Sequence, residues 1–446
     1  MVRVRRMRAC LLAVLVTVPA LAAEPAKAFP WPVRTSRLAN GLTVMRVPYA
    51  SPGLVAYYTV VRVGSRNEVE PGHTCFAHFF EHMMFRGTRR FPEGARTALL
   101  GSLGFNENAF TSDDVTVYTV NGPTAQLDTL VDVEADRFRA LEYAEEPFKT
   151  EAAAVLGEYN KNAANPGLKI EETLLGAAFT KHPYRHTTLG FLDDIRAMPT
   201  RYEYSKQFFR RWYTPDNCVV IVVGDFDDTT LMQTIEKAYG PWTGRAATVS
   251  IPKEPPFTGP RTAELTWTSP TLPRTGLFFR VPASPPGSKE AALLTVLGQY
   301  LAGPTSPLFT SLVLERQLVE KLAPSADEHR DPYLFGLEAR LKDEAHRAEV
   351  DRALTDTIAT LAKGTVDEQR LADIRDHLRF GLLMELESPA AIAEALAMAV
   401  GISGDVDALE KGQRHLATLT SAELVAFVRA HLVPKNQLAL RFLVKP

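Results

Sequence analysis

The sequence predicts an α+β fold of two tandem homologous domains, each a mostly antiparallel sheet packed against helices. At 446 residues the chain is longer than one hydrophobic core usually supports, so two domains are expected. Strand-like and helix-like segments alternate through the first half, and the mixture starts again after a proline-rich stretch. The segments "FFRRWYTPDNCVVIVV" and "FVRAHLVPKNQLALRF" repeat a helix, Pro-x-Asn and strand pattern, with Pro215 and Pro434 219 residues apart. We therefore infer a duplicated domain.

The N-terminus has the composition of a targeting segment. "MVRVRRMRACLLAVLVTVPALAAEP" begins with four arginines and then runs uncharged from Ala9 to Ala23. That run is short for a bilayer span, and its Ala20-Leu21-Ala22 ending fits a signal peptidase site. We expect a signal peptide over residues 1–23 and a periplasmic or secreted mature chain with no membrane span. An uncleaved membrane anchor is the alternative.

Residues 31–247 are predicted to form the first domain. Strands are expected in "GLTVMRV", "GLVAYYTVVRVGS" and "NCVVIVVGDF", and a strand pair in "NENAFTSDDVTVYTV", because these segments are rich in β-branched and aromatic residues. Helices are expected over roughly 73–85, 94–104, 123–142, 145–163, 169–178 and 202–213. Residues 248–262 are the predicted linker, because the stretch 243–262 holds four prolines and little apolar periodicity.

Residues 263–446 are predicted to form the second domain. Strands are expected near 263–268, 275–281 and 333–341, and in the final "QLALRFLV". Helices are expected near 288–301 and 306–320, with several more before the last strand.

Composition excludes some classes of function. The chain is 46% hydrophobic and 23% charged, as expected for a globular protein. A formal charge of −2, with no basic run after the first ten residues, argues against nucleic-acid binding.

Cys75 and Cys218 would remain in the mature chain after export. One disulfide is possible in an oxidising compartment, but two small buried apolar residues are the favoured interpretation.

The stretch "TCFAHFFEHMMFRGT" carries the strongest chemical pattern. His78 and His82 are four residues apart, so on a helix their imidazoles share one face and can reach one ion. Zinc accepts imidazole nitrogens, and a catalytic zinc site takes three protein ligands and leaves one position open. Glu81, on nearly the same face, can accept a proton from water as it attacks a carbonyl. The alternatives are a core helix with incidental histidines, and Cys75 as a disfavoured extra ligand.

A third ligand is expected on the helix "EEPFKTEAAAVLGEYNKN". Glu151 and Glu158 are seven residues apart and therefore on one face, beside the apolar run 152–156. Acids that face inward need a cation or hydrogen-bond donors. Glu158 as ligand and Glu151 as a carboxylate that orients a zinc-bound histidine would meet that need. Pairing with surface lysines such as Lys149 and Lys161 is the alternative.

With these residues in place, the chain resembles the pitrilysin and insulin-degrading-enzyme family of inverzincin metallopeptidases (M16), in the small two-domain class that includes mitochondrial processing peptidase. The family motif is His-x-x-Glu-His followed by a glutamate about 75 residues on, and 75 residues separate His82 from Glu158 here. Similar segments are "LANGLTVMRVP", "VRVGSRNE", "AHFFEHMMFRGTRRFP", "NAFTSDDVTVY", "KHPY" and "YTPDNCVVIVVGDF". The resemblance implies Zn2+ on His78, His82 and Glu158, with Glu81 as general base and Glu151 in support.

The resemblance also implies a way of binding substrate. "NAFTSDDVTVY" resembles the family's edge strand, to which a peptide adds as a further strand, with Asn108 and Ala109 as backbone contacts. Main-chain hydrogen bonds of this kind hold any extended peptide and leave selectivity to side-chain pockets. An exposed edge also invites aggregation, so enclosure in a chamber is expected.

The second half departs from the family pattern. Its segment "SKEAALLTVLGQYLAG" has no His-x-x-Glu-His. Arg316 falls near the family's substrate-binding arginine, but the family's Gly-Leu-Ala-Tyr is replaced by Gln317-Leu318-Val319-Glu320, so the tyrosine is missing. The resemblance therefore implies a zinc-bearing endopeptidase subunit whose companion chain supplies an Arg/Tyr pair in a clamshell heterodimer; a homodimer is possible. The alternative is a non-catalytic or weakly active peptide-binding or scaffold subunit.

Overall fold

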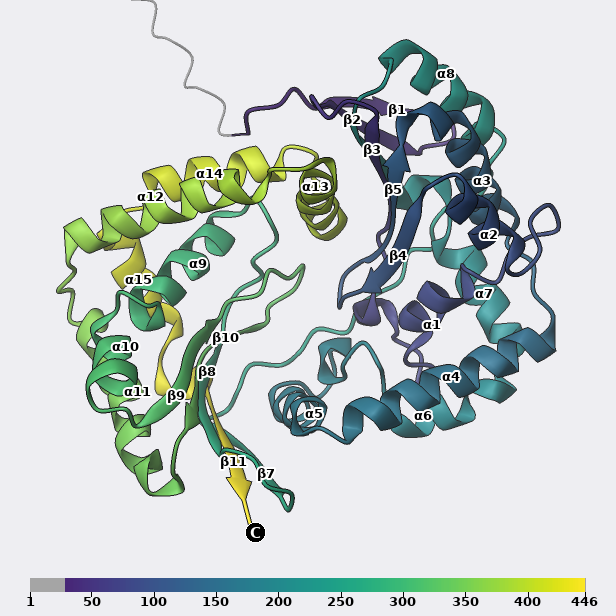
Figure 1. The fold of residues 1–446 in the computed structure, drawn as a ribbon. Coiled ribbons are helices and arrows are strands. Elements are labelled where there is room, and N and C mark those ends of the chain that lie inside the picture. The colour runs from purple at the N-terminus through teal and green to yellow at the C-terminus, as the bar shows by residue number, and fades with distance from the viewer. Residues whose placement is uncertain (1–28, 446) are drawn as a thin grey trace, which may run out of the picture.

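The computed structural model describes residues 29–445, which form two sheets with helices around them (Figure 1). The first sheet has six strands in the order β1-β2-β6-β3-β5-β4 and the second has five in the order β7-β11-β8-β10-β9. The strands are β1 (Arg34–Arg37), β2 (Thr43–Pro48), β3 (Leu54–Val61), β4 (Asn106–Thr111), β5 (Thr116–Pro123), β6 (Cys218–Gly224), β7 (Arg261–Trp267), β8 (Arg274–Arg280), β9 (Val319–Ser325), β10 (Leu334–Leu341) and β11 (Gln437–Val444). The predicted signal peptide lies outside the described residues.

The two sheets have the same topology. From β2 onward, β2-β6-β3-β5-β4 corresponds strand for strand to β7-β11-β8-β10-β9. In each sheet the first of these pairs is parallel and the others are antiparallel. The predicted α+β fold with two tandem homologous domains is therefore confirmed.

The repeated Pro-x-Asn segments have the same structure. Both form a short 3-10 turn, η5 (Pro215–Asn217) and η8 (Pro434–Asn436), directly before the strand that pairs in parallel. The Asn217 amide donates to the backbone oxygen of Trp212 at 2.9 Å, and Asn436 donates to that of His431 at 3.0 Å. In both cases the asparagine satisfies a carbonyl five residues back at the end of a helix.

Most helices of each domain cover one face of its own sheet, and one helix from the other domain covers the opposite face. The first domain contains α1 (Phe76–Met83), α2 (Ala95–Ser102), α3 (Leu127–Ala140), α4 (Glu145–Ala163), α5 (Pro166–Ala178), α6 (Leu192–Ala197), α7 (Tyr202–Trp212) and α8 (Asp228–Tyr239). The second contains α9 (Lys289–Ala302), α10 (Pro307–Phe309), α11 (Arg347–Ala362), α12 (Glu368–Glu385), α13 (Pro389–Ser403), α14 (Ala408–Thr418) and α15 (Ser421–His431). Each domain has its own apolar core between sheet and helices.

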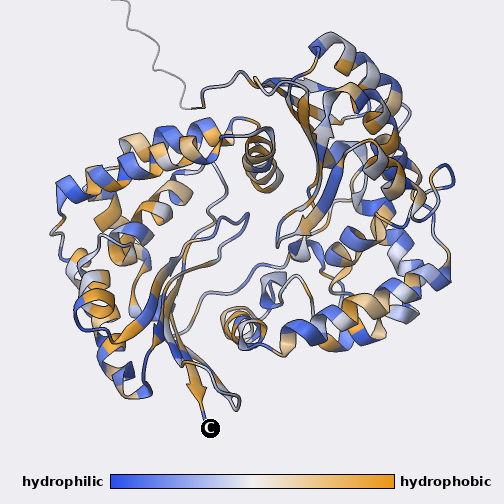
Figure 2. Cartoon of the chain, viewed as in Figure 1, coloured by the Kyte–Doolittle hydropathy of each residue, from blue (hydrophilic) through white to orange (hydrophobic). Residues whose placement is uncertain are grey.

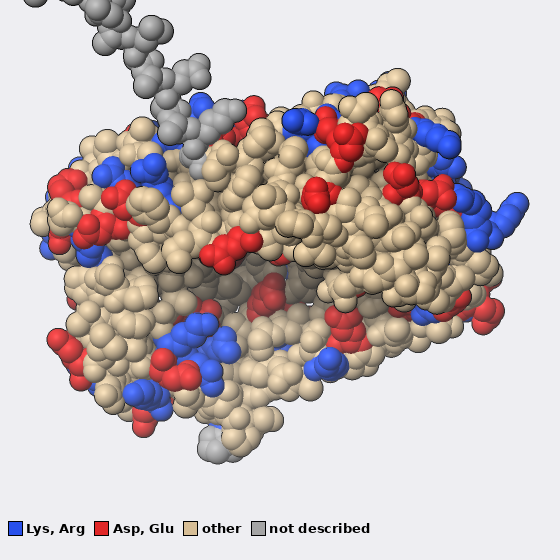
Figure 3. Space-filling view, turned by 45° about the horizontal axis from the view of Figure 1, so that its top comes forward, with Lys and Arg blue, Asp and Glu red and all other residues tan. Residues whose placement is uncertain are grey.

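The domains exchange one helix each. Helix α13 of the second domain, coloured mainly as hydrophobic in Figure 2, packs on β3 and β6 of the first sheet, where Ile392 and Leu396 meet Tyr58 and Ile221. Helix α5 of the first domain packs in the same way on β7 and β11. These two apolar contacts join the domains. The face of the molecule drawn in Figure 3 is hollowed near its middle.

One predicted helix is shorter than expected. A helix was expected near 306–320, but α10 runs only into a short π-helix, η6 (Thr310–Glu315), and a strand, β9, begins at Val319. Gln317 has a φ of 51°, in the left-handed region, which ends the helix. The following residues then pair with β10, a partner that local sequence does not show.

Two further points concern export and the cysteines. Within the described part of the chain, Cys75 and Cys218 are both free and buried, which agrees with the favoured interpretation. Among residues 29–445, every helix is too short or too polar to span a membrane.

Candidate metal centre

Helix α1 is held at its start by a buried carboxylate. Glu68 accepts hydrogen bonds from the backbone N–H groups of Cys75 and Ala77, each at 2.7 Å. Backbone N–H groups at a helix N-terminus have no partner inside the helix, so a carboxylate there satisfies them. Burial raises the pKa of Glu68 to about 8. Cys75 has a φ of 75°, so the chain enters the helix through a strained residue whose amide Glu68 holds.

The sequence of α1 divides into two faces. Phe76, Phe79, Phe80 and Met83 are buried in the core of the first domain. The other face presents His78, Glu81 and His82 toward α4 and β4. The apolar face therefore fixes the direction in which the polar residues point.

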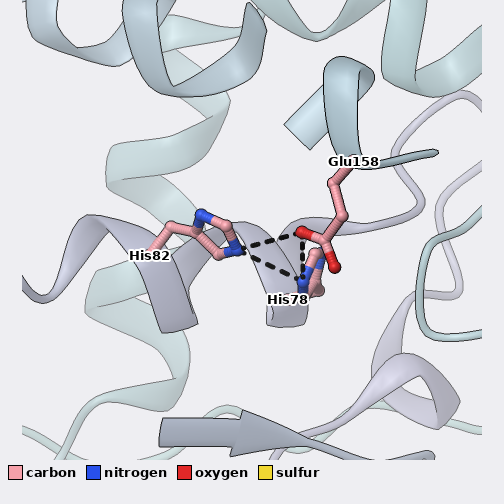
Figure 4. A group of neighbouring side chains, drawn as sticks. All are labelled: His78, His82 and Glu158. Carbon is pink, nitrogen blue, oxygen red and sulfur yellow. Dashed lines mark hydrogen bonds and ion pairs between the residues drawn. The ribbon is translucent and has the colours of Figure 1, made fainter. Parts of the chain in front are cut away.

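Three side chains converge on one point (Figure 4). The Nε2 atoms of His78 and His82 are 3.3 Å apart, and Oε2 of Glu158, from α4, lies 3.5 and 3.4 Å from them. Ligands held about 2.0–2.1 Å from a tetrahedral zinc ion would lie about 3.3–3.4 Å from each other. The donor types and their spacing therefore both fit zinc. Within residues 29–445, His78, His82 and Glu158 are the one group of histidine, cysteine or acidic side chains whose spacing could hold a metal ion.

Glu151 orients one of the histidines. Its Oε1 lies 2.8 Å from Nδ1 of His82, and its Oε2 accepts from Nε of Arg86 at 2.6 Å. A hydrogen bond at Nδ1 leaves Nε2 of His82 free to bind a metal. Nδ1 of His78 lies 3.7 Å from the thiol of Cys75. The Cys75 thiol thus lies beside Nδ1 of His78, away from the Nε2 atoms. Glu158 is the side chain that lies next to both Nε2 atoms, as predicted for the third ligand.

The electrostatics suit a cation. Burial, with help from His82, lowers the pKa of His78 to about 4, so its imidazole is neutral at physiological pH. The hydrogen bond to Glu151 raises the pKa of His82. Burial favours the neutral acid at Glu151, but hydrogen bonds from His82 and Arg86 outweigh it and lower the pKa of that carboxyl. A buried neutral imidazole next to ionised carboxylates is a site that a divalent cation would stabilise.

Glu81 stands between α1 and β4. Burial raises the pKa of its carboxyl. Its Oε2 accepts a hydrogen bond from the hydroxyl of Thr111, the last residue of β4, at 2.7 Å. The candidate general base is therefore held by the strand that was predicted to receive substrate.

Strand β4 is at the edge of its sheet, paired only with β5 among the described strands. A cavity lies beside β4 and adjoins the candidate metal-binding side chains. The cavity is lined by Glu81, His82, Phe85, Arg86, Glu93, Gly94, Thr97, Asn108, Ala109 and Glu151. The predicted substrate contacts Asn108 and Ala109 thus adjoin the cavity that also reaches Glu81 and His82.

Arg316 is not brought to this cluster. It follows η6 in the second domain and forms an ion pair with Glu349 of α11 on the surface.

The sequence analysis did not identify Glu68, Arg86 and Thr111 as residues that support the candidate site. Arg86 lies three residues beyond the end of α1, and it meets Glu151 only because α4 packs beside that helix. Thr111 ends a strand that was predicted, but its contact with Glu81 on α1 joins two separate elements, which no local pattern predicts.

Comparison with known proteins places the chain in a family. Residues 54–190 match the model of "Insulinase (Peptidase family M16)", and residues 201–378 match "Peptidase M16 inactive domain". Together the matches cover most of both domains. The chain belongs to the M16 metallopeptidase family.

Relatives with zinc-protease names cover much of the chain. It is 27% identical to "Zinc protease PqqE" of Helicobacter pylori, over 87% of each protein. It is 31% identical to "Probable zinc protease PqqL" of Escherichia coli over 45% of this chain and 22% of that one. A crystal structure of a Helicobacter pylori protease matches with a TM-score of 0.84 at 26% identity, over 93% of this chain and 99% of that one. An M16-like peptidase from Alicyclobacillus acidocaldarius has the same fold, with a TM-score of 0.84 at 21% identity, over 94% and 100%.

Proposed function

We propose that this chain is an exported zinc-dependent endopeptidase that hydrolyses extended or unfolded peptides. The observation that carries the proposal is the placement of His78, His82 and Glu158 at zinc spacing, with Glu81 beside them at an open strand edge. The zinc-protease names of the relatives support it.

The residues have distinct roles in this proposal. A zinc ion bound by His78, His82 and Glu158 would polarise the scissile carbonyl and a water molecule. Glu81 takes the proton of the attacking water and passes it to the leaving amine, and its raised pKa suits both steps. Strand β4 holds the substrate by main-chain hydrogen bonds at Asn108 and Ala109.

The first prediction concerns the general base. Glu81→Gln should leave about one zinc ion per chain, because the metal-binding side chains are intact. It should lower kcat about 10²–10⁴-fold, the usual contribution of general acid–base catalysis. Metal analysis by mass spectrometry and a broad peptide panel check both parts. Glu146→Gln, an exposed position on α4, is the matched control. Normal hydrolysis by Glu81→Gln would rule out this mechanism.

A second candidate is a zinc-dependent peptide-binding subunit with little turnover. The observation that favours it is the absence of the family's tyrosine after Arg316, since one lost contact to a tetrahedral intermediate can cost about 10²–10³ in rate. Tight peptide binding without hydrolysis, in a chain that binds zinc, would favour this candidate.

The missing tyrosine also leads us to propose a companion chain. A homologous subunit that supplies an Arg/Tyr pair would complete the site, in a heterodimer or, with Arg316 alone, a homodimer. We expect the purified chain to be weakly active and to gain activity with a companion of similar length recovered with it from the native periplasm. Full activity of the isolated monomer would contradict this proposal.

Export is part of the proposal. The arginine-rich start followed by an uncharged run supports a signal peptide over residues 1–23. The relative PqqL is described as a periplasmic protease, which supports the same compartment. N-terminal sequencing of the mature protein would test the cleavage position.

A further inference from the structure

A loop of the second domain reaches across to the first. Residues 327–331, between β9 and β10, make several polar contacts there. Nε2 of His329 lies 3.0 Å from Oδ2 of Asp113, the backbone N–H of Arg330 donates to Asp114 at 3.1 Å, and Asp331 accepts from Nε of Arg66 at 2.6 Å. These contacts are largely buried: His329 is 6% exposed and Asp114 is 1% exposed. The loop is thus packed into the first domain.

The contacts fall on the turn that ends the candidate substrate strand. Asp113 and Asp114 lie in the four-residue turn between β4, which ends at Thr111, and β5, which begins at Thr116. The turn is closed by a backbone bond from Ser112 to Val115 at 2.8 Å, and the Ser65 hydroxyl donates to Asp113 at 2.9 Å. Thr111, two residues before Asp113, is the residue whose hydroxyl holds Glu81. A shift of this turn would therefore move both the strand and the partner of Glu81.

The same loop also touches the support of α1. Arg66, the partner of Asp331, lies two residues before Glu68, which holds the start of α1. Its backbone N–H donates to the carbonyl of Asp113 at 2.8 Å. The two elements that carry the candidate site, α1 and β4, are thus tied to each other and to the second domain at one place.

The loop is itself firmly held. The Arg330 guanidinium donates to the backbone oxygens of Gly401 and Ile402, the latter at 2.7 Å, at the end of α13. The ring of His329 stacks on Tyr333 with 3.5 Å between centroids. Tyr184 donates to Asp114 at 2.9 Å and receives the backbone N–H of Asp331 at 3.4 Å. The loop is therefore fixed both by its own domain and by the first domain.

We propose that the 327–331 loop of the second domain positions β4, the candidate substrate-binding strand. Because Thr111 of β4 holds Glu81, the loop also helps to position Glu81. The domain without a metal site would in this way take part in catalysis. His329 and Asp331 are positioning residues in this scheme. The expected change in peptide hydrolysis rests on the proposed peptidase function. The expected change in the backbone mobility of β4 does not.

The experiment compares His329→Ala with the parent chain. The matched control is His377→Ala, which removes an exposed histidine from α12 of the same domain. Backbone hydrogen exchange followed by mass spectrometry should become about tenfold faster in residues 106–111, as expected when a hydrogen bond to a charged group is lost. Zinc content should be unchanged. The KM for a peptide should rise about tenfold with a smaller change in kcat, because the strand binds substrate.

A conservative variant separates positioning from folding. His329→Gln keeps a donor that can reach Asp113 and should restore most of the parent exchange rate and KM. If His329→Ala does not fold, Asp331→Asn, which keeps the shape of the side chain, should give the same pattern. Faster exchange confined to residues 327–331, with 106–111 unchanged, would overturn the proposal. The exchange result holds even if no peptide is hydrolysed, so failure of the peptidase function would be seen separately.

Discussion

Glu151 shows how one residue can control the candidate site without binding metal. It contacts His82 through one oxygen and Arg86 through the other, and it is 5% exposed. Its charge is compensated on both sides, so it can stay ionised in a buried position. The carboxylate selects the tautomer of His82 and fixes the plane of the ring.

Replacing Glu151 by glutamine should weaken zinc binding about 10–100-fold, the range seen when partners of metal-binding histidines are changed. The amide keeps the shape of the side chain but removes its charge, so the metal-binding atoms themselves remain. Competition with a chromogenic chelator measures the affinity. Glu146→Gln on the exposed side of α4 is the control. An unchanged zinc affinity would show that Glu151 does not act on His82.

Single residues also show the limits of sequence reasoning at this site. His78, His82 and Glu158 could be predicted because the motif spacing sets the first two on one face and the inward face of a later helix offers the third, and the resemblance implies the same set. Thr111 could not, because its hydroxyl meets Glu81 only after β4 folds against α1. Cys75 was disfavoured as a ligand, and it instead contacts Nδ1 of His78.

At the scale of elements, α1 was predicted well because its phenylalanines and methionine recur at helical spacing. Its start was placed three residues early, at 73 instead of Phe76, because the carboxylate that holds it belongs to Glu68, several residues upstream. The helix predicted near 306–320 ends at Glu315, so Val319 and Glu320, the first two residues of β9, were wrongly predicted as helix. The backbone of β9 pairs with β10, and that pairing outweighs local preference.

At the scale of the whole molecule, the contact between the domains should respond to acid. Burial acts to raise the pKa of Asp331, but hydrogen bonds from His182 and Arg66 outweigh it and lower that pKa to about 2. A carboxyl with a lowered pKa in the folded state adds stability above its ordinary pKa of about 3.9, and this stability is lost as the pH falls toward 2.

Asp331→Asn should therefore lower the free energy of unfolding at pH 7, and its difference from the parent should shrink between about pH 4 and pH 2. Urea unfolding at a series of pH values measures the difference. Asp356→Asn, an exposed position on α11, should show no such trend. A difference between Asp331→Asn and the parent that stays constant over this range would contradict the assignment.

The sequence by itself determined the fold class and the duplication, and it predicted His78, His82 and Glu158 as metal ligands. These inferences depend on periodicity, on residue spacing and on a motif, all of which can be read from the order of residues in the chain. The tertiary structure decided that Glu81 is held by Thr111, that Arg316 lies away from the metal cluster, and that a loop of the second domain holds the turn after β4. The contact of Glu81 with Thr111 forms when the first domain folds, and the contact of the 327–331 loop with the turn after β4 forms only when both domains have packed. Neither contact can be read from local sequence.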